Sequence, residues 1–234
     1  HVVFKAVPRS EVPKFAKILT STWAMKQKAD GTLQARINVL GYEQVPGEHY
    51  NETGISPPVV NEASVFIILI LIVMANMYAE LNDVKGAFLN GHFSQGKKLY
   101  TEVPKGFEKF YPLNVVLLLL KAIYGLKQAA FEYCKTLLNA LKTVSLRQSK
   151  ADPCVYFKWS KSGLMIWSSW VDDLMSYVKK EDVLQGRNAI KHHFELDEIG
   201  ELERSMLVVR LSITQRKAGC NLRNSFVTKL QRRI

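Results

Sequence analysis

The feature that most constrains this chain is the acidic pair Asp172-Asp173, which lies between two alternating apolar runs. Leu164 to Ser169 and Leu174 to Val178 have the pattern of strands, and a short corner between two such runs predicts a β-hairpin. Its tip would carry two neighbouring carboxylates, which raise each other's pKa unless cations lie between them. The pattern favours a site for divalent metal, and the open alternative is an ordinary solvated turn.

A third acidic residue, Asp83, strengthens the metal-site interpretation. It follows the apolar segment Met77 to Leu81 and begins the stretch Asp83-Val84-Lys85-Gly86-Ala87-Phe88-Leu89-Asn90-Gly91. We expect Asp83 and Asp172 to meet at a common pair of magnesium ions, although they are far apart in the chain.

The composition predicts a well-packed protein with a polyanionic partner. Of the 234 residues, 47% are hydrophobic, which is enough for one large domain or two small lobes. Lys and Arg number 32 against 21 Asp and Glu, so the net charge is +11. This excess favours nucleic acid as the partner, and the open alternative is a generally basic protein.

The cysteines and the apolar runs exclude several classes of protein. Cys134, Cys154 and Cys220 are widely spaced, which argues against a zinc site or a disulfide framework and predicts reduced, buried thiols in an intracellular protein. Val65 to Ala75 is too short to cross a bilayer of about 30 Å and has no signal-peptide flank, so we expect a buried helix, no membrane span and no secretion. The chain begins with His1 rather than Met, and we expect a segment of a longer polypeptide.

The remaining periodicity predicts an α+β fold. Residues 23–28 and 32–39 alternate around Asp30-Gly31, which predicts a hairpin. Asn61 should cap a helix that is apolar nearly all round and buried, and two more helices should follow Gln128 and Glu181. In the first of these two, Ala130, Tyr133, Leu137 and Leu141 recur at helical spacing, which predicts a face in the core rather than a binding site. Further strands are expected at residues 97–103, 115–120, 155–158 and 206–213. This order suits an antiparallel sheet backed by helices, the split βαβ arrangement.

Several stretches together resemble the reverse transcriptase of copia-type long-terminal-repeat retrotransposons. They are Trp23 to Lys28 with Asp30-Gly31, Ala35-Arg36, Gly41-Tyr42-Glu43-Gln44, Asp83-Val84-Lys85 with Ala87 to Gly91, Pro104 with Gly106-Phe107, Tyr124 to Ala129, Asp152-Pro153-Cys154, and Val171-Asp172-Asp173. Their order and spacing cover nearly the whole chain. The resemblance implies a right-hand polymerase fold with fingers and palm.

The resemblance also implies a division of the chain. Residues 1–58 and 93–123 would form the fingers, and residues 59–92 and 124–219 would form the palm. Residues 220–234 would begin a thumb or connection, so the thumb would be largely missing. The domain would belong to a Pol polyprotein that also carries protease, integrase and ribonuclease H, in a cytoplasmic particle or the nucleus.

Carried over by position, the resemblance assigns a role to each motif residue. Asp83, Asp172 and Asp173 would be the catalytic, metal-binding carboxylates, loaded with Mg²⁺ or alternatively Mn²⁺. The implied dNTP-binding residues are Lys26, Lys28, Arg36, Val84, Phe88, Tyr124 and Gln128. Within this set the cations would contact the triphosphate, Phe88 would block a ribose 2′-hydroxyl, and the turn Tyr124 to Gln128 would border the templating pair. The partners would be an RNA template, a DNA or tRNA primer, and dNTP.

Several positions depart from the family pattern and keep two alternatives open. The departures are Trp170 for Tyr, Ala130 for Pro, Gln34 and Leu40 for basic residues, and Val208 for Gly. They favour a catalytically decayed, nucleic-acid-binding remnant of the same domain as the second reading. A third reading is an integrase or ribonuclease H nuclease, for which Glu195, Glu198 or Glu201 would supply the Glu.

Overall fold

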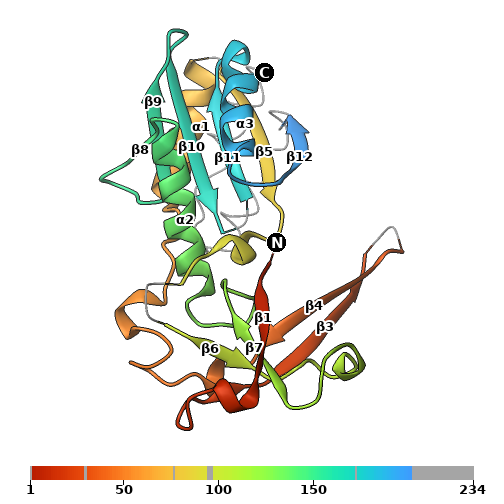
Figure 1. Ribbon diagram of the computed structural model, residues 1–234. Coiled ribbons are helices and arrows are strands. Elements are labelled where there is room, and N and C mark those ends of the chain that lie inside the picture. Colours follow the sequence, from red (N-terminus) through yellow and green to blue (C-terminus); the bar gives the residue numbers. More distant parts are fainter. Residues whose placement is uncertain (1, 29–30, 76, 94–96, 172, 202–234) are drawn as a thin grey trace, which may run out of the picture.

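The computed structural model describes residues 2–28, 31–75, 77–93, 97–171 and 173–201. It consists of a six-stranded sheet with helices on both faces, and a smaller region with a four-stranded sheet and a separate two-stranded hairpin (Figure 1). The predicted α+β class is therefore confirmed. The predicted strand at 206–213 lies outside the described residues.

The large sheet is antiparallel throughout, in the order β12-β5-β11-β10-β9-β8. Its strands are β5 (Tyr78–Val84), β8 (Arg147–Gln148), β9 (Val155–Trp159), β10 (Leu164–Trp170), β11 (Asp173–Val178) and β12 (Leu196–Glu201). The helices are α1 (Glu62–Met74), α2 (Ala129–Thr143) and α3 (Val183–Lys191). The predicted antiparallel sheet backed by helices is thus confirmed, whereas β8 and β12 were not predicted.

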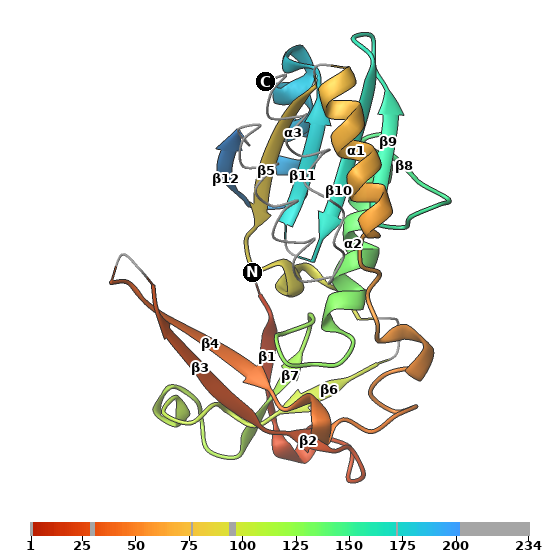
Figure 2. The same cartoon turned by 180° about the vertical axis from the view of Figure 1, so that it is seen from behind.

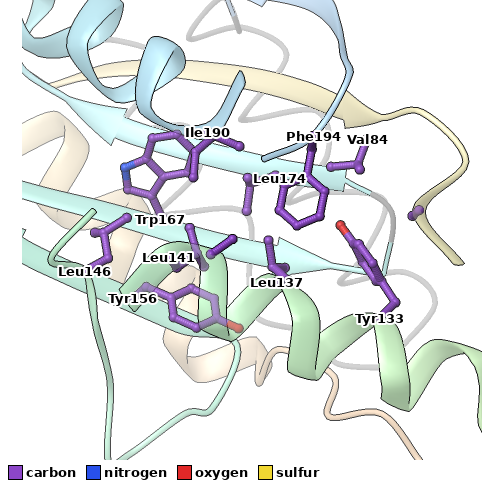
Figure 3. Close-up of a cluster of buried hydrophobic side chains, with 12 residues drawn as sticks. Val84, Tyr133, Leu137, Leu141, Leu146, Tyr156, Trp167, Leu174, Ile190 and Phe194 are labelled. Carbon is purple, nitrogen blue, oxygen red and sulfur yellow. The ribbon is translucent and has the colours of Figure 1, made fainter. Parts of the chain in front are cut away.

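One face of the large sheet packs against α2 and α3. Figure 3 shows this core, in which the α2 side chains Tyr133, Leu137 and Leu141 face the sheet, Leu141 near Trp167 of β10 and Tyr133 beside Phe194. Ile190 contributes to the same cluster from α3. The helical spacing of the α2 residues predicted this buried face, because positions three and four apart share one side of a helix.

On the opposite face of the sheet lies α1 (Figure 2). Ile68 and Ile72 of α1 pack there with Leu81 and Met175. The prediction that α1 is buried all round is wrong, because three side chains on its outer side are exposed: Ile67, Ile70 and Met74. A helix laid on a sheet contacts it through one stripe only, so an apolar sequence does not by itself bury the other side.

Asn61 caps α1, as the sequence predicts. The Asn61 Oδ1 accepts a hydrogen bond from the Ala63 N–H at 2.9 Å, as expected for a residue capping α1.

Cys154 is buried and Cys134 is half-buried, and both are free thiols. Burial raises the pKa of each to about 11, which makes them poor nucleophiles. Cys220 lies outside the described residues. None of the helices in the described part of the chain is long and apolar enough to span a membrane.

The smaller region has a sheet in the order β1-β7-β6-β2 and the hairpin β3-β4. Its strands are β1 (Phe4–Pro8), β2 (Ile18–Leu19), β3 (Ser21–Gln27), β4 (Leu33–Val39), β6 (Leu99–Thr101) and β7 (Val115–Leu119). The short 3₁₀ helices of the chain are η1 (Arg9–Glu11), η2 (Gly41–Glu43), η3 (Glu52–Gly54), η4 (Ala87–Asn90), η5 (Glu108–Phe110) and η6 (Lys180–Asp182). The predicted hairpin is confirmed. β2 was missed because it has only two residues, and β1 because its side chains are mostly exposed, with Val7 buried.

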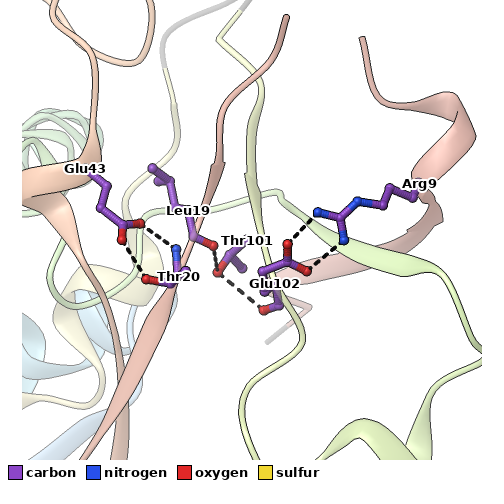
Figure 4. A network of polar contacts seen from close by, with 6 residues as sticks. All are labelled: Arg9, Leu19, Thr20, Glu43, Thr101 and Glu102. Carbon is purple, nitrogen blue, oxygen red and sulfur yellow. Dashed lines mark hydrogen bonds and ion pairs between the residues drawn. The ribbon is translucent and has the colours of Figure 1, made fainter. Parts of the chain in front are cut away.

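A network of polar contacts holds these short strands together (Figure 4). Both carboxylate oxygens of Glu43 accept hydrogen bonds from Thr20, one from its N–H and one from its hydroxyl, each at 2.7 Å. The Thr101 hydroxyl donates to the Leu19 carbonyl at 3.0 Å. Glu43 therefore ties η2 to the start of the β3-β4 hairpin.

An ion pair with a buried carboxylate attaches α3 to the large sheet, and its loss should reduce stability strongly. Arg187 on α3 donates to the carboxylate of Glu80, which is 1% exposed on β5. Arg187→Leu would leave that carboxylate buried without its cation, so we expect the free energy of unfolding to fall by about 3–5 kcal/mol. Urea denaturation followed by circular dichroism measures this change.

The exposed pair between Lys85 and Glu195 provides the control. Its Nζ–Oε1 distance is 2.9 Å and its side chains are 43% and 62% exposed. Lys85→Met should cost less than about 1 kcal/mol, because water screens a surface pair. Equal losses in the two variants would contradict the assignment of α3 anchoring to the buried pair.

Candidate active site

Asp83 and Asp173 lie directly opposite each other on neighbouring strands. β5 and β11 are antiparallel, and their register pairs Asp83 with Asp173. Residues opposed in this way project to the same face of the sheet, with Cβ atoms about 4.5–5.5 Å apart. Both side chains are half-buried. The two acidic stretches singled out in the sequence therefore meet at one place.

The corner that precedes Asp173 is tight. β10 ends at Trp170, which pairs with Asp173, so only Val171 and Asp172 separate the two strands. Val171 has φ +55°, as a tight two-residue corner requires. A β-branched residue pays about 1–2 kcal/mol for that conformation. Asp172 lies outside the described residues, so its expected meeting with Asp83 stays a prediction.

The Asp83–Asp173 pair suits a hard divalent cation. Carboxylate oxygens are the ligands that Mg²⁺ and Mn²⁺ prefer, and two carboxylates on adjacent positions repel each other without a cation between them. No cluster of three or more His, Cys, Asp or Glu side chains that could hold a metal occurs among the described residues. A complete ligand set would need the side chain of Asp172 as well.

Arg36, Tyr124 and Phe88 form a stack that links the β3-β4 hairpin to the end of β5. The guanidinium carbon of Arg36 is 5.0 Å from the centroid of the Tyr124 ring. The Tyr124 and Phe88 ring centroids are 4.9 Å apart, with an angle of 52° between the planes. Phe88 lies on η4, which follows β5 after one turn. Three predicted nucleotide-binding residues are thus brought together, and an aromatic ring supports the Arg36 cation.

Lys26 shares the Arg36 face of the hairpin. Its cross-strand partner is Gln34, whereas Arg36 pairs with Ala24, so both cations alternate to the same side. Lys26 is exposed. Lys28 follows the end of β3 and is also exposed, and its N–H donates to the Thr32 carbonyl at 2.9 Å.

Two of the predicted nucleotide-binding side chains are buried. Val84 is 2% exposed and belongs to the core beneath α2, on the opposite face of β5 from Asp83. Gln128 is 4% exposed, and its amide accepts from Gln44 at 2.9 Å and donates to the His49 carbonyl at 3.2 Å. Both side chains are therefore engaged in packing or internal hydrogen bonds.

Residues 39–44 dock on residues 124–128, and we call this contact the joint. The Val39 N–H donates to the Tyr124 carbonyl at 2.9 Å, and the Lys127 N–H donates to the Gln44 side chain at 2.8 Å. A Cβ on Gly41 would lie 2.1 Å from the Gly125 carbonyl oxygen. The glycines allow the two backbones to approach this closely. Both stretches are recognisable motifs in the sequence, but no sequence signal predicts that they are in contact.

The loop that follows Gln44 is held by polar contacts within itself and to the joint. His49 is buried, and its Nδ1 accepts a hydrogen bond from the Val45 N–H at 2.8 Å. Burial lowers the pKa of His49, which favours the neutral ring that can accept this bond. Lys127 donates to the Tyr50 hydroxyl at 3.0 Å and lies over the Tyr50 ring.

The helical spacing of Tyr133 predicted a core residue, and the structure also places its ring beside Phe88. The centroids of these rings are 6.5 Å apart, and Tyr133 in turn meets Phe194 edge-on at 6.2 Å. Phe88 is therefore held between Tyr124 and Tyr133. The only sequence signal for this support was the helical spacing of Tyr133 on α2.

Comparisons with known proteins identify the family of the chain. The model of the family described as reverse transcriptase (RNA-dependent DNA polymerase) matches residues 4–232. The Retrovirus-related Pol polyprotein from transposon TNT 1-94 of Nicotiana tabacum is 32% identical over 209 residues, which are 86% of this chain and 15% of that protein. The Pol polyprotein from transposon RE1 of Arabidopsis thaliana is 30% identical over 218 residues, 88% of this chain and 14% of that protein.

The chain thus spans about 15% of the length of these curated relatives. A solved structure, the protease-reverse transcriptase of prototype foamy virus, is similar over 82% of this chain and 21% of that chain, with 12% identity and a TM-score of 0.40. The family match covers nearly every residue and confirms the resemblance seen in the sequence. The chain belongs to the reverse transcriptase (RNA-dependent DNA polymerase) family.

Proposed function

We propose that this domain performs RNA-directed DNA synthesis by transferring a nucleotide from dNTP to a primer 3′-hydroxyl. The observation that carries the proposal is the register pairing of Asp83 with Asp173. These carboxylates, together with Asp172, would hold two Mg²⁺ ions, or Mn²⁺ in their place. When bound, the ions lower the pKa of the primer hydroxyl and neutralise the charge of the triphosphate and the leaving pyrophosphate.

The chain's own residues would position the reactants. Arg36 would hold the triphosphate with its planar fork, and Lys26 and Lys28 would add positive charge along the hairpin. The Tyr124 ring under Arg36 supports this role, because it limits the directions in which the guanidinium can point. Val84 and Gln128 would not contact the nucleotide directly. They would position its site by fixing the backbone of β5 and of the joint.

Phe88 would select deoxyribonucleotides by occupying the space of a ribose 2′-hydroxyl. Its ring is held by Tyr124 and Tyr133, so it cannot move aside easily. Phe88→Ala should therefore reduce the preference for dNTP over rNTP by roughly 10- to 200-fold. Steady-state kcat/KM for a matched dNTP and rNTP pair measures the ratio, and Phe88→Tyr, which keeps the ring, should retain the preference. An unchanged ratio in Phe88→Ala would contradict the role.

We also propose the lobes and partners that the resemblance implies. Residues 1–58 and 93–123 would be fingers, residues 59–92 and 124–219 palm, and residues 220–234 the start of a thumb or connection. The segregation of strands supports this division, since the smaller sheets use residues 4–39 and 99–119. An RNA template and a DNA or tRNA primer would be the substrates with dNTP, and integrase and ribonuclease H would be neighbouring Pol domains in an intracellular particle.

Primer extension tests the proposed function. The folded protein should add deoxynucleotides to a primed RNA template when Mg²⁺ or Mn²⁺ is present, and a chelator should stop the reaction. Denaturing gel electrophoresis of a labelled primer gives the readout. Folded protein that extends no primer with either metal would contradict present catalytic activity.

A catalytically decayed remnant is the second candidate function. The position of Gln34 in the β3-β4 hairpin favours it. Gln34 lies opposite Lys26 on the Arg36 face, where it places a neutral amide beside the proposed triphosphate contacts. The remnant would bind nucleic acid without chemistry. If extension appears only when Gln34→Lys, Leu40→Arg and Val208→Gly restore the family's residues, the remnant is the correct function for the natural sequence.

A further inference from the structure

The β3-β4 hairpin has a second face that the proposed catalysis does not use. Trp23 and Met25 alternate away from Arg36, and Leu33 faces the same side from β4. Met25 and Leu33 are 76% and 81% exposed. The hairpin therefore carries cations on one face and exposed apolar side chains on the other.

The loop from Pro104 to Phe110 adds two aromatic rings to this second face. The Phe107 ring centroid is 5.2 Å from Trp23 and 5.6 Å from Phe110. Phe107 is 43% exposed and Phe110 is 64% exposed. The Trp23 indole N–H donates to the Lys105 carbonyl at 3.0 Å, which fixes the loop to the hairpin. We call Trp23, Phe107 and Phe110 the aromatic platform.

The loop of the aromatic platform carries two lysines and one glutamate. Lys105 and Lys109 are exposed in the same loop, and the Lys109 Nζ lies 5.1 Å from the centroid of the Phe110 ring. The acidic residue of this loop, Glu108, accepts a hydrogen bond from the Gly106 N–H at 2.8 Å. The loop backbone is thereby held in place while its two cations face solvent.

We propose that the aromatic platform binds unpaired bases of single-stranded RNA. Exposed rings beside lysines provide the two interactions that such strands use, which are stacking on base faces and contact with phosphates. A base-paired duplex hides its base faces within its own stack, so the platform should prefer a single strand. The inference rests on the proposed function, in which that strand is the part of the template not paired with primer.

The positive charge argues for this ligand over a second copy of the chain. The net charge of the whole protein is +11, so two copies would repel each other as they met through this lysine-flanked face. The phosphates of an RNA strand complement the positive charge of Lys105 and Lys109, and its bases can make cation–π contacts with these lysines. Self-association through the apolar side chains is kept as an outcome of the test.

Fluorescence anisotropy with a short labelled single-stranded RNA tests the platform. Phe110→Ala should weaken binding about tenfold, because stacking of one base on one ring is lost. Phe110→Tyr keeps an aromatic ring and should bind like the natural protein. The matched control is Phe15→Ala, since Phe15 is 98% exposed, is flanked by Lys14 and Lys17, and has no ring contact among the described residues.

The outcomes separate the platform from the proposed function. Weakening confined to Phe110→Ala, with a smaller effect on blunt RNA duplex, supports the platform even if the natural protein extends no primer. Equal effects of Phe110→Ala and Phe15→Ala overturn it, also in a protein that extends primers normally. A dimer in sedimentation that Phe110→Ala dissociates, with RNA affinity unchanged, likewise overturns it. Matching thermal unfolding curves exclude loss of folding as the cause.

Discussion

Asp83→Asn is expected to reduce primer extension by roughly 10³-fold or more while leaving RNA affinity and folding unchanged. The substitution keeps the size of the side chain but removes the negative charge that would hold a metal beside Asp173. Catalysis by positioning and charge neutralisation offers no other group to take over, so the loss should reach or exceed the upper end of the roughly 10²–10³-fold cost of deleting one electrostatic stabiliser. Single-turnover incorporation with saturating Mg²⁺ measures the effect.

Two further variants make the result specific. Asp172→Asn should be as inactive as Asp83→Asn, because the proposal assigns both to one site. Glu195→Gln removes a nearby negative charge whose partner is the exposed Lys85, and its activity should stay within about twofold of the natural protein. Extension that survives in Asp83→Asn would exclude Asp83 as a required ligand. Loss of primer extension in Glu195→Gln would instead indicate that Glu195 belongs to the active site, as in the integrase or ribonuclease H alternative.

Gly125→Ala is expected to be the most disruptive single methyl addition in the joint. Gly125 has φ +91°, and a Cβ there would lie 2.0 Å from the Val39 carbonyl oxygen and 3.0 Å from the Val39 nitrogen. Both atoms belong to backbone that the Val39 to Tyr124 hydrogen bond holds in place. Relief of the clash would separate the joint, so we expect a loss of at least about 3 kcal/mol in the free energy of unfolding.

Gly106→Ala separates the clash from the backbone strain. Gly106 has a nearly identical φ of +89°, but a Cβ there would meet nothing within 4 Å. Its cost should be about 1–2 kcal/mol, from the left-handed conformation alone. Urea denaturation of both variants measures the difference. If the two variants lose the same free energy of unfolding within error, the joint relaxes around the added methyl group at no cost. Gly125 would then not be required for the close approach of the two backbones.

The local elements were largely predictable, because their signals lie within a few neighbouring residues. The alternation around Asp30-Gly31 predicted β3 and β4, and the spacing of Tyr133, Leu137 and Leu141 predicted the buried face of α2. Burial of α1 was predicted wrongly, since a sequence shows that a helix is apolar but not how many of its sides have a neighbour.

The nucleotide-site residues show the same limit. Position in the family pattern named Arg36, Phe88 and Tyr124, and the structure brings all three into one stack. Position also named Val84 and Gln128, whose side chains are buried in packing and internal hydrogen bonds. A motif reports that a residue is needed at a place, and it does not report whether the side chain faces a substrate or the core.

By itself, the sequence determined the α+β class, the family and the acidic stretches, because composition and short-range pattern carry that information. Only the tertiary structure decided that Asp83 lies opposite Asp173, that Gly41 meets Gly125, and that aromatic rings gather behind the hairpin. These facts depend on the register between strands and on contacts between distant segments. Such contacts are fixed by how whole faces pack together, since a shift of one residue in register would send every side chain to the other face.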